Sequence, residues 1–498
     1  MRENRLFAAV DVAQVHGVFH VRQAVVVVGP LRVVDPHRGV ADDLDAVVGY
    51  AEAVRAAVVA RAELACFHVA ERSISRARRR HSKDHPHRQY GNNTVHFRIL
   101  PSRSIIAPGS WIVMSGRLKY TMGMKANSPA GKRYCADLLA KLVDIPSVFP
   151  NEEEATLFLE RELATLGLRP ERIHLDESRF NLLCRIGSGS PRVCLNAHID
   201  TVPPKGESVP TARVDGDVIY GLGACDDKAS VAAIISAGLE IASRADEFDG
   251  GVDVMVSVDE EDGGCGVETA IKQGYKCDYA IVGEPSDLDV VPAHNGLLWL
   301  FLTARGVAAH GSAPWAGVNA IERMMGVVEE LRNTISVFPP HELTGPMSLN
   351  LGMLSGGDLP NRVPASCEAV VDIRLAPPTT LEQVREAVRP VLESRDWLEC
   401  KSGKGRNGLN TPLDSRLVKT VLECAGELGI DSKIVGGRGW TEAESFRTML
   451  GIEAIVCGPG SMKQAHTSNE SVKVSEVHKA AELYVRCVER LLAQTARS

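Results

Sequence analysis

An imidazole and a carboxylate follow a strand-like run in the stretch CLNAHIDTVPP. His198 and Asp200 lie two residues apart, just before the prolines that end any strand pairing. Alternate side chains of a strand share a face, so both groups point the same way from its carboxyl end. A histidine that binds a metal usually donates its other ring N–H to a carboxylate, which sets its tautomer. Asp200 is placed to orient His198 in this way, although a surface turn would explain the pair if it stood alone.

Further acidic and imidazole groups recur where other strand-like or glycine-rich segments end. Side chains that follow the strands of a parallel sheet gather beyond the carboxyl ends of those strands. Each group taken singly could be merely solvated, but together they predict one shared crevice. These groups are Asp226 in GLGACDDKAS, Asp259, Glu260 and Glu261 in VSVDEEDGG, Glu284 in AIVGEP and His466 in CGPGSMKQAHTS.

The types of these donors indicate a metal centre. Oxygen and nitrogen ligands without thiolate suit zinc, manganese or cobalt. Two imidazoles and three carboxylates can hold two ions if one carboxylate bridges them. Metal binding lowers the pKa of water from about 15.7 to about 7, which is worth roughly 12 kcal/mol, whereas a general base alone supplies about 10²–10⁴-fold. The pattern therefore predicts hydrolysis that depends on metal.

The elements that must position these groups alternate between strands and helices. Two amphipathic helices are expected in CADLLAKLVDIPSVFPNEEEATLFLERELATLGL, split at IPSVFPN, with Asn151 capping the second. Strand-like NLLCRIG, PRVCLNAHID, GVDVMVSVDEE and YAIVGEP then alternate with helical DKASVAAIISAGLEIASRA and a helix from about Val267. This alternation predicts an α/β fold, a mostly parallel sheet with helices on both faces.

The length of 498 residues suggests more than one domain. Strands and two helices interleave differently in residues 296–405, which predicts a smaller inserted α+β domain. The catalytic domain would then comprise residues 125–295 and 406–498.

The first 113 residues differ from the rest in composition. They hold 15 arginines but one lysine, and the basic tract RARRRHSKDHPHR interrupts Ala/Val-rich runs with little periodicity. We expect residues 1–113 to be a poorly ordered extension, from a start codon placed too early. The true start would then be Met114, Met122 or Met124.

Composition also limits the classes of function. The formal net charge of −7 argues against a general nucleic-acid binder, although the basic tract leaves binding through the extension as an alternative. No apolar run is long enough to span a membrane. The twelve cysteines are scattered singly, which favours reduced thiols in a cytoplasmic protein.

The order HxD, GxGxxD, DEE, GEP and a late histidine resembles the dinuclear-zinc aminoacylase and peptidase family. That family includes acetylornithine deacetylase, succinyl-diaminopimelate desuccinylase and glutamate carboxypeptidases, and the likeness spans some 360 residues from about Leu138. The tracts LNLGMLSGGDLPNRVPASCEAVVDIR, WTEAESF and GPGSMKQAH are most similar to acetylornithine deacetylases. Asp227 and Ala229 depart from the family pattern.

The resemblance implies roles for particular residues. Asp226 would bridge two zinc ions, for which cobalt or manganese could substitute, Glu260 would be the general base and Asp200 would orient His198. The inserted domain would form a homodimer and act as a lid, with His310 reaching the partner's site to stabilise the oxyanion. The other implied ligands are His198 and Glu284 on one ion and Glu261 and His466 on the second, and the implied substrate-binding residues are Asn361, Arg374 and Thr441.

The resemblance implies that the reaction is removal of an N-acyl group from an amino acid, with N-acetylornithine the first candidate and acetate and ornithine the products. A desuccinylase, dipeptidase or carboxypeptidase of the same family is the nearest alternative. A metal-binding protein without catalysis is an alternative from another class. An intrasheet ion pair is the structural alternative for Arg374.

Overall fold

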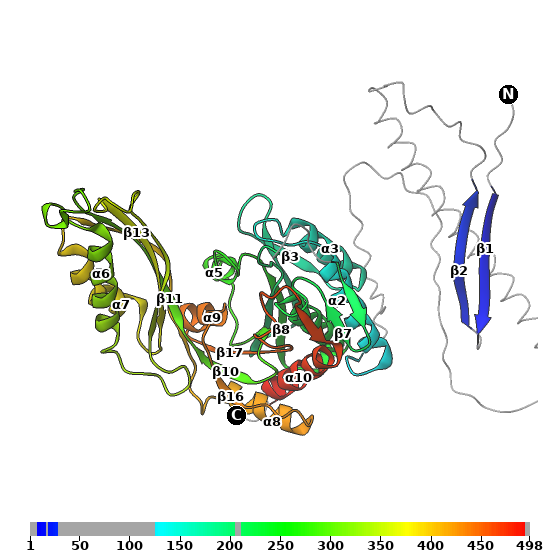
Figure 1. The fold of residues 1–498 in the computed structure, drawn as a ribbon. Helices are drawn as coiled ribbons and strands as arrows, with labels where there is room; N and C mark the ends of the chain where they lie inside the picture. Colours follow the sequence, from blue (N-terminus) through cyan, green and yellow to red (C-terminus); the bar gives the residue numbers. More distant parts are fainter. Residues whose placement is uncertain (1–6, 16–17, 28–124, 205–210, 494–498) are drawn as a thin grey trace, which may run out of the picture. The chain divides into compact units, whose positions relative to one another are not determined.

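The computed structural model describes residues 7–15, 18–27, 125–204 and 211–493, and the chain divides into two units, Met1–Val113 and Met114–Ser498 (Figure 1). In the first unit, β1 (Phe7–Val15) pairs antiparallel with β2 (Val18–Val27). Apart from these two strands, the predicted extension and its alternative starts lie outside the described residues.

A nine-stranded mixed sheet forms the centre of the second unit (Figure 1). Its strand order is β15-β10-β17-β9-β5-β8-β4-β3, and β16 pairs with β10. The four strands β17, β9, β5 and β8 run parallel, and antiparallel neighbours flank them. The strands are β3 (Pro170–His174), β4 (Phe180–Ser188), β5 (Arg192–His198), β8 (Gly250–Ser257), β9 (Tyr279–Pro285), β10 (Val290–His294), β15 (Leu409–Asn410), β16 (Ile434–Gly437) and β17 (Glu453–Gly458).

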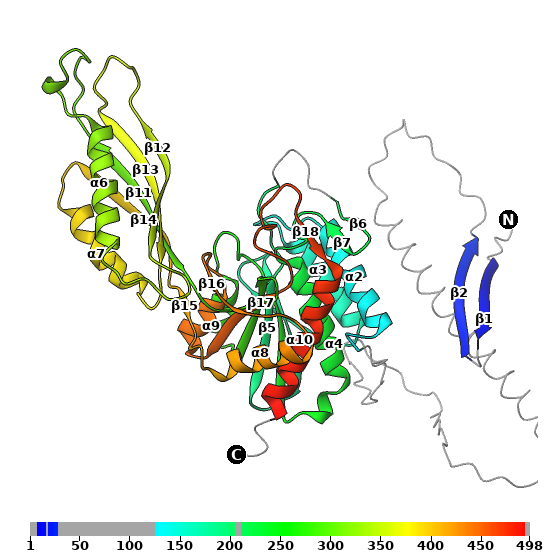
Figure 2. The same ribbon diagram turned by 60° about the horizontal axis from the view of Figure 1, so that its bottom comes forward.

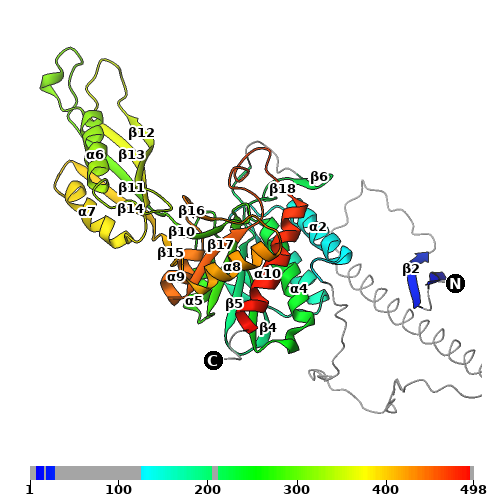
Figure 3. The ribbon, with the colours of Figure 1, turned by 90° about the horizontal axis from the view of Figure 1, so that it is seen from below.

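Helices cover both faces of this sheet, which explains why its inner strands are buried along nearly their whole length. On one face α4 packs against α2 and α10, and α10 against α8, as Figures 2 and 3 show. The opposite face carries α5 and α9. The helices are α2 (Pro129–Asp144), α3 (Glu153–Thr165), α4 (Lys228–Ser243), α5 (Gly266–Lys272), α8 (Arg416–Glu427), α9 (Ala443–Leu450) and α10 (Val474–Ala493), with the short 3₁₀ turn η1 (Ala245–Glu247).

The predicted cap of the second helix is wrong by one residue. Helix α3 begins at Glu153, and its N-cap is Glu152, which makes no side-chain capping hydrogen bond. The N–H of Thr156 donates to the main-chain carbonyl of Glu152, so Glu152 and not Asn151 is the N-cap. Acidic residues in the first turn, Glu153 and Glu154, favour this helix end through its positive partial charge.

A separate antiparallel sheet lies in the stretch from Gly296 to Arg406, in the order β12-β13-β11-β14. Helices α6 and α7 cover one face, where they build a hydrophobic core of their own (Figure 1). Burial alternates along β13 because its other face is left open. The elements are β11 (Gly296–Arg305), η2 (Pro314–Ala316), α6 (Ala320–Ile335), β12 (Ser348–Gly356), β13 (Ser366–Leu375), α7 (Leu381–Glu393) and β14 (Leu398–Arg406).

A small three-stranded sheet completes the second unit. Its order is β18-β7-β6, and all its pairs are antiparallel. The pairing of β18 with β7 joins chain segments about 250 residues apart. Strand β18 directly follows the loop that carries His466. The strands are β6 (Arg213–Asp215), β7 (Val218–Tyr220) and β18 (Ser471–Lys473).

The predicted fold class is confirmed: a mixed, centrally parallel sheet with helices on both faces, and a separate small antiparallel sheet. The predicted ranges 125–295, 296–405 and 406–498 stay predictions for the domains. Within the described residues, none of the helices has the length and apolar character needed to cross a membrane.

Candidate metal centre

Parallel strands bring the predicted ligands to one edge of the central sheet. His198 is the last residue of β5 and lies opposite Ser257, the last residue of β8. Glu284 lies near the carboxyl end of β9, which is the other parallel neighbour of β5. Because the three strands run the same way, the loop after β8, with Glu260 and Glu261, opens at the same edge.

His198 lies at the centre of the cluster and is buried. Its Nε2 lies 3.1 Å from Oδ1 of Asp226 and 3.7 Å from Oε1 of Glu284. Its Nδ1 lies 3.0 Å from the main-chain carbonyl of Asp200. The Nδ1–H···O=C contact leaves Nε2 unprotonated and free to bind a metal in the neutral ring.

Asp226 lies between the two imidazoles. Its Oδ1 faces His198, while its Oδ2 lies 3.4 Å from Nε2 of His466. The same ring nitrogen of His466 lies 3.0 Å from Oε1 of Glu261. A carboxylate whose two oxygens face different ligands is arranged to join two adjacent cation sites.

Two groups of three side chains have ligand atoms that lie within 4.8 Å of one another. They are His198 with Glu260 and Glu284, and His198 with Asp226 and Glu261. The structure thus brings the predicted ligands and Glu260 together, and His466 adjoins the second group. The division differs from the predicted one, because His198 belongs to both groups and Glu260 to the first.

The electrostatics of the cluster fit a cation. Burial, reinforced by neighbouring carboxylates, raises the pKa of Glu260 and Glu284 well above the ordinary range. Hydrogen bonds to Asp226 and Glu261 raise the pKa of His466 to about 10. Buried acids that repel one another are stabilised by positive charge, and this donor set of oxygens and imidazoles suits zinc, cobalt or manganese.

Asp200 contacts both His198 and the loop that follows β8. Its carboxylate lies 3.5 Å from Nδ1 of His198, farther than its own main-chain carbonyl. The carboxylate also accepts hydrogen bonds from the backbone N–H groups of Glu260 (3.2 Å) and Glu261 (2.9 Å). Asp200 therefore ties the end of β5 to the loop that carries both glutamates.

Residues that the sequence analysis did not assign also hold this loop. Asp259 has a positive φ of 71°, which aspartate tolerates better than most residues. Its Oδ1 accepts from Arg179 Nη1 at 2.7 Å and its Oδ2 from the N–H of Cys265 at 3.1 Å. Buried Glu442 accepts from the hydroxyl of Ser257 and the N–H of Val267. Apart from Cys265, these partners are distant in the chain, so no local pattern could have found them.

His310 and Asn361 lie together in the Gly296–Arg406 stretch. The N–H of Gly311 donates to the carbonyl of Asn361 at 2.7 Å, and His310 pairs with Arg362 in an isolated bridge. The His310 ring is exposed, with Nδ1 2.8 Å from Ser312 Oγ. Among the described contacts, neither His310 nor Asn361 bonds to the metal-ligand cluster.

The other two predicted substrate residues already have partners. Arg374 Nε donates to Oδ2 of Asp372 at 3.0 Å, and Trp299 donates to the other oxygen of that carboxylate. This intrasheet pair is the structural alternative given above for Arg374. Thr441 immediately precedes Glu442, and its Oγ1 lies 3.1 Å from Nε2 of buried His294.

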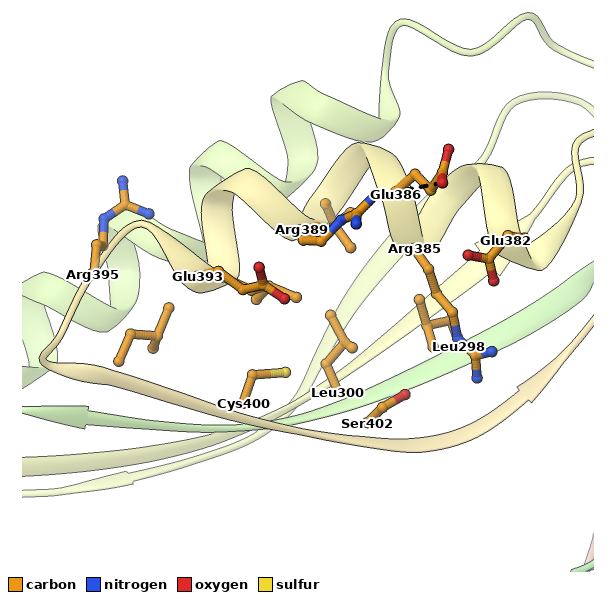
Figure 4. Close-up of a pocket in the computed structure, with 13 residues that line it drawn as sticks. Leu298, Leu300, Glu382, Arg385, Glu386, Arg389, Glu393, Arg395, Cys400 and Ser402 are labelled. Carbon is orange, nitrogen blue, oxygen red and sulfur yellow. Dashed lines mark ion pairs between the residues drawn. The ribbon is translucent and has the colours of Figure 1, made fainter.

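A cavity of about 640 Å³ lies between α7 and strands β11 and β14, in a different part of the fold (Figure 4). Leu298 and Leu300 form part of its lining, and Arg385 and Glu393 extend from α7 over it. None of the predicted site residues lines it, so it is separate from the metal centre.

Comparison with known families and proteins places the cluster in context. The profile described as "Peptidase family M20/M25/M40" matches residues 194–490. That range includes every predicted ligand, from His198 to His466.

Individual relatives differ in their described activities. An acetylornithine deacetylase of Proteus mirabilis is 29% identical over 398 residues, covering 72% of this chain and 98% of its own. A probable carboxypeptidase of Aspergillus terreus is 31% identical over 382 residues, covering 70% and 84%. The crystal structure of a tripeptidase from Staphylococcus aureus superposes with a TM-score of 0.62 at 22% identity, covering 73% of this chain and 99% of that one.

Metal binding should release protons. With a pKa of about 10, the His466 ring of the metal-free protein is protonated at neutral pH, and it must lose that proton to become a ligand. The apparent affinity for zinc should therefore rise as the pH increases towards this pKa. Titration calorimetry in buffers of different ionisation enthalpy measures the release, and a binding enthalpy independent of buffer would contradict the expectation.

Proposed function

Because this chain belongs to the peptidase family M20/M25/M40, a family of metallohydrolases that act on peptide and amide bonds, we propose that it removes the N-acyl group of an amino acid. The first candidate substrate is N-acetylornithine, and the centre would hold two zinc ions. The observation that carries the proposal is Asp226, whose two oxygens face His198 and His466 within a buried acidic cluster.

The proposed ligands of the first ion are His198, Asp226 and Glu284, and those of the second are Asp226, Glu261 and His466. The contacts of His198 with Glu284 and of His466 with Glu261 support this division. Bound zinc supplies a lowered pKa for water and polarises a carbonyl oxygen. Cobalt or manganese could replace it, since the donors are imidazole and carboxylate.

Glu260 is the proposed general base. It is buried beside His198 and Glu284, and burial raises its pKa, which favours its accepting a proton. It would take a proton from the attacking water as the new C–O bond forms. It would then deliver that proton to the leaving nitrogen as the C–N bond breaks, which yields acetate and the free amine.

The backbone contacts of Asp200 support a positioning role. Its carboxylate accepts from the N–H groups of Glu260 and Glu261, so it would hold the base and a ligand together while its carbonyl orients His198. These contacts would hold Glu260 in one position throughout turnover.

Recognition of the substrate is assigned to the separate sheet and its neighbours. Asn361, Arg374 and Thr441 are the proposed contacts, and an arginine suits a carboxylate. Arg374 would have to leave Asp372 or share it with the substrate. Because a deacetylase and a carboxypeptidase match this chain at similar identity, a desuccinylase or carboxypeptidase remains the second candidate.

A homodimer is part of the proposal. Strand β12 is at the edge of its sheet, and Met353 and Leu354 on it are exposed. An edge strand with exposed apolar side chains favours pairing with another strand. His310 would then act in the site of the second subunit, where it would stabilise the oxyanion.

Replacing Glu260 should separate binding from chemistry. Glu260→Ala should keep both metals, measured by metal analysis after gel filtration, and lose about 10²–10⁴-fold in kcat because the base is gone. Glu247→Ala, a change at an exposed glutamate in η1, is the control and should retain full turnover. Comparable turnover in Glu260→Ala would rule out the assigned role.

A substrate panel should identify the acyl group. We expect the zinc- or cobalt-loaded protein to hydrolyse N-acetylornithine with a higher kcat/KM than succinyl-diaminopimelate or dipeptides. The measurement is release of the free amine. A preference for another member of the panel would replace the first candidate, and retained metal without any hydrolysis would favour a metal-binding protein without catalysis.

Mixing two inactive variants should test the role of His310. Glu260→Ala and His310→Ala should each be poorly active alone, but subunit exchange should restore turnover, since one site of a mixed dimer would combine an intact Glu260 with an intact partner histidine. Sedimentation equilibrium checks the dimer. A monomer, or a mixture no more active than its components, would contradict the proposal.

A further inference from the structure

The carboxylate of Glu470 is buried close to the metal centre and has no part in the proposed mechanism. Its Oε1 accepts hydrogen bonds from the backbone N–H groups of Cys225 (2.8 Å) and Asp226 (2.9 Å). Its Oε2 accepts from the N–H of Gly223 at 3.0 Å. One side chain thus holds three amides of the loop that ends at the proposed bridging carboxylate.

This loop, residues 221–226 between β7 and α4, needs such a partner. All six residues are buried, so their N–H groups cannot be satisfied by water. Gly223 has a φ of +76°, and a Cβ there would lie 2.6 Å from Cγ2 of Thr201, so the backbone is closely packed. Neighbouring amides that point to one spot form a site for an anion, and the Glu470 carboxylate fills it.

The fold delivers Glu470 to the loop through a strand pair. Ser471, the first residue of β18, lies opposite Tyr220, the last residue of β7. The residue before β18 therefore meets the residues after β7, and the carbonyl of Glu470 also accepts from the N–H of Gly221 at 3.1 Å. His466 lies four residues before Glu470 on the same loop.

We propose that Glu470 is a positioning residue of the metal centre, which fixes the main chain at Asp226 so that the two carboxylate oxygens face His198 and His466. It would also set the spacing between the Asp226 loop and the His466 loop, because it joins them through four hydrogen bonds. The inference rests on the proposed two-ion centre. Hydrogen bonds that a carboxylate accepts from backbone N–H groups are stronger than those that a neutral group accepts.

The first test is Glu470→Gln, which keeps the shape but puts an amide group where the third backbone N–H needs an acceptor. Glu453→Gln is the matched control, since Oε2 of Glu453 accepts from the N–H of Leu417 at the start of α8. Glu470→Gln should lose about 10–100-fold in metal affinity, the usual cost when a residue that supports ligands is changed. Glu453→Gln should bind metal like the unaltered protein.

Affinity would be measured by competition with a chelator, and the ligand geometry by the absorption spectrum of bound cobalt. The spectrum of Glu470→Gln should change, whereas a purely structural role would lower thermal stability and leave the spectrum alone. Unchanged affinity and spectrum in Glu470→Gln would overturn the inference. Failure of the unaltered protein to bind metal would instead overturn the proposed function.

Hydrogen exchange in the unaltered protein provides a test that needs no variant. If Glu470 holds the loop, the N–H groups of Gly223, Cys225 and Asp226 should be protected from exchange in both the metal-free and the metal-loaded protein. Rapid exchange of these amides in the folded, metal-free protein would show that Glu470 does not position the loop, and would overturn the inference.

Discussion

The candidate metal centre depends on one electrostatic constraint: several carboxylates are buried together at one edge of the sheet. Burial and mutual repulsion oppose the ionised forms of Glu260 and Glu284. The imidazoles of His198 and His466, which lie against Asp226, offset part of this cost. A bound cation would offset the rest. The donors and the need for charge therefore lead to the same expectation, a site whose acids are stable only beside positive charge.

Backbone hydrogen bonds keep the acids in place. Asp200 accepts from the amides of Glu260 and Glu261, and Glu470 accepts from the loop before α4. Asp259 accepts from Arg179, which ties the loop after β8 to the residues before β4. In each case a buried carboxylate accepts from groups on another segment, so loops from different strands are joined directly. Rigid support of this kind matters because ligand positions must be set before a metal or substrate arrives.

The proposed metal ligands and the proposed substrate contacts lie in different parts of the fold. Except for Asp226, which follows β7 of the small antiparallel sheet, the ligands belong to the parallel strands and the loops after them. The proposed substrate contacts are dispersed, with Arg374 paired to Asp372, Asn361 beside His310, and Thr441 against His294. Relatives described as a deacetylase and a carboxypeptidase share the first set of features at similar identity. The reaction type is thus better supported than the acyl group.

The sequence by itself determined the alternation of strands and helices, and with it the sheet whose carboxyl edge gathers His198, Glu260, Glu284 and the rest, because strand periodicity and apolar runs are local properties. The predicted N-cap at Asn151 was wrong, since Glu152 is the N-cap and makes no side-chain capping hydrogen bond. Only the tertiary structure decided which carboxylates accept hydrogen bonds from the loops that carry the proposed ligands. The partners of Glu470 lie 244–247 positions away, and those of Asp200 about 60 away, and no periodicity connects residues that meet only after the sheet has formed.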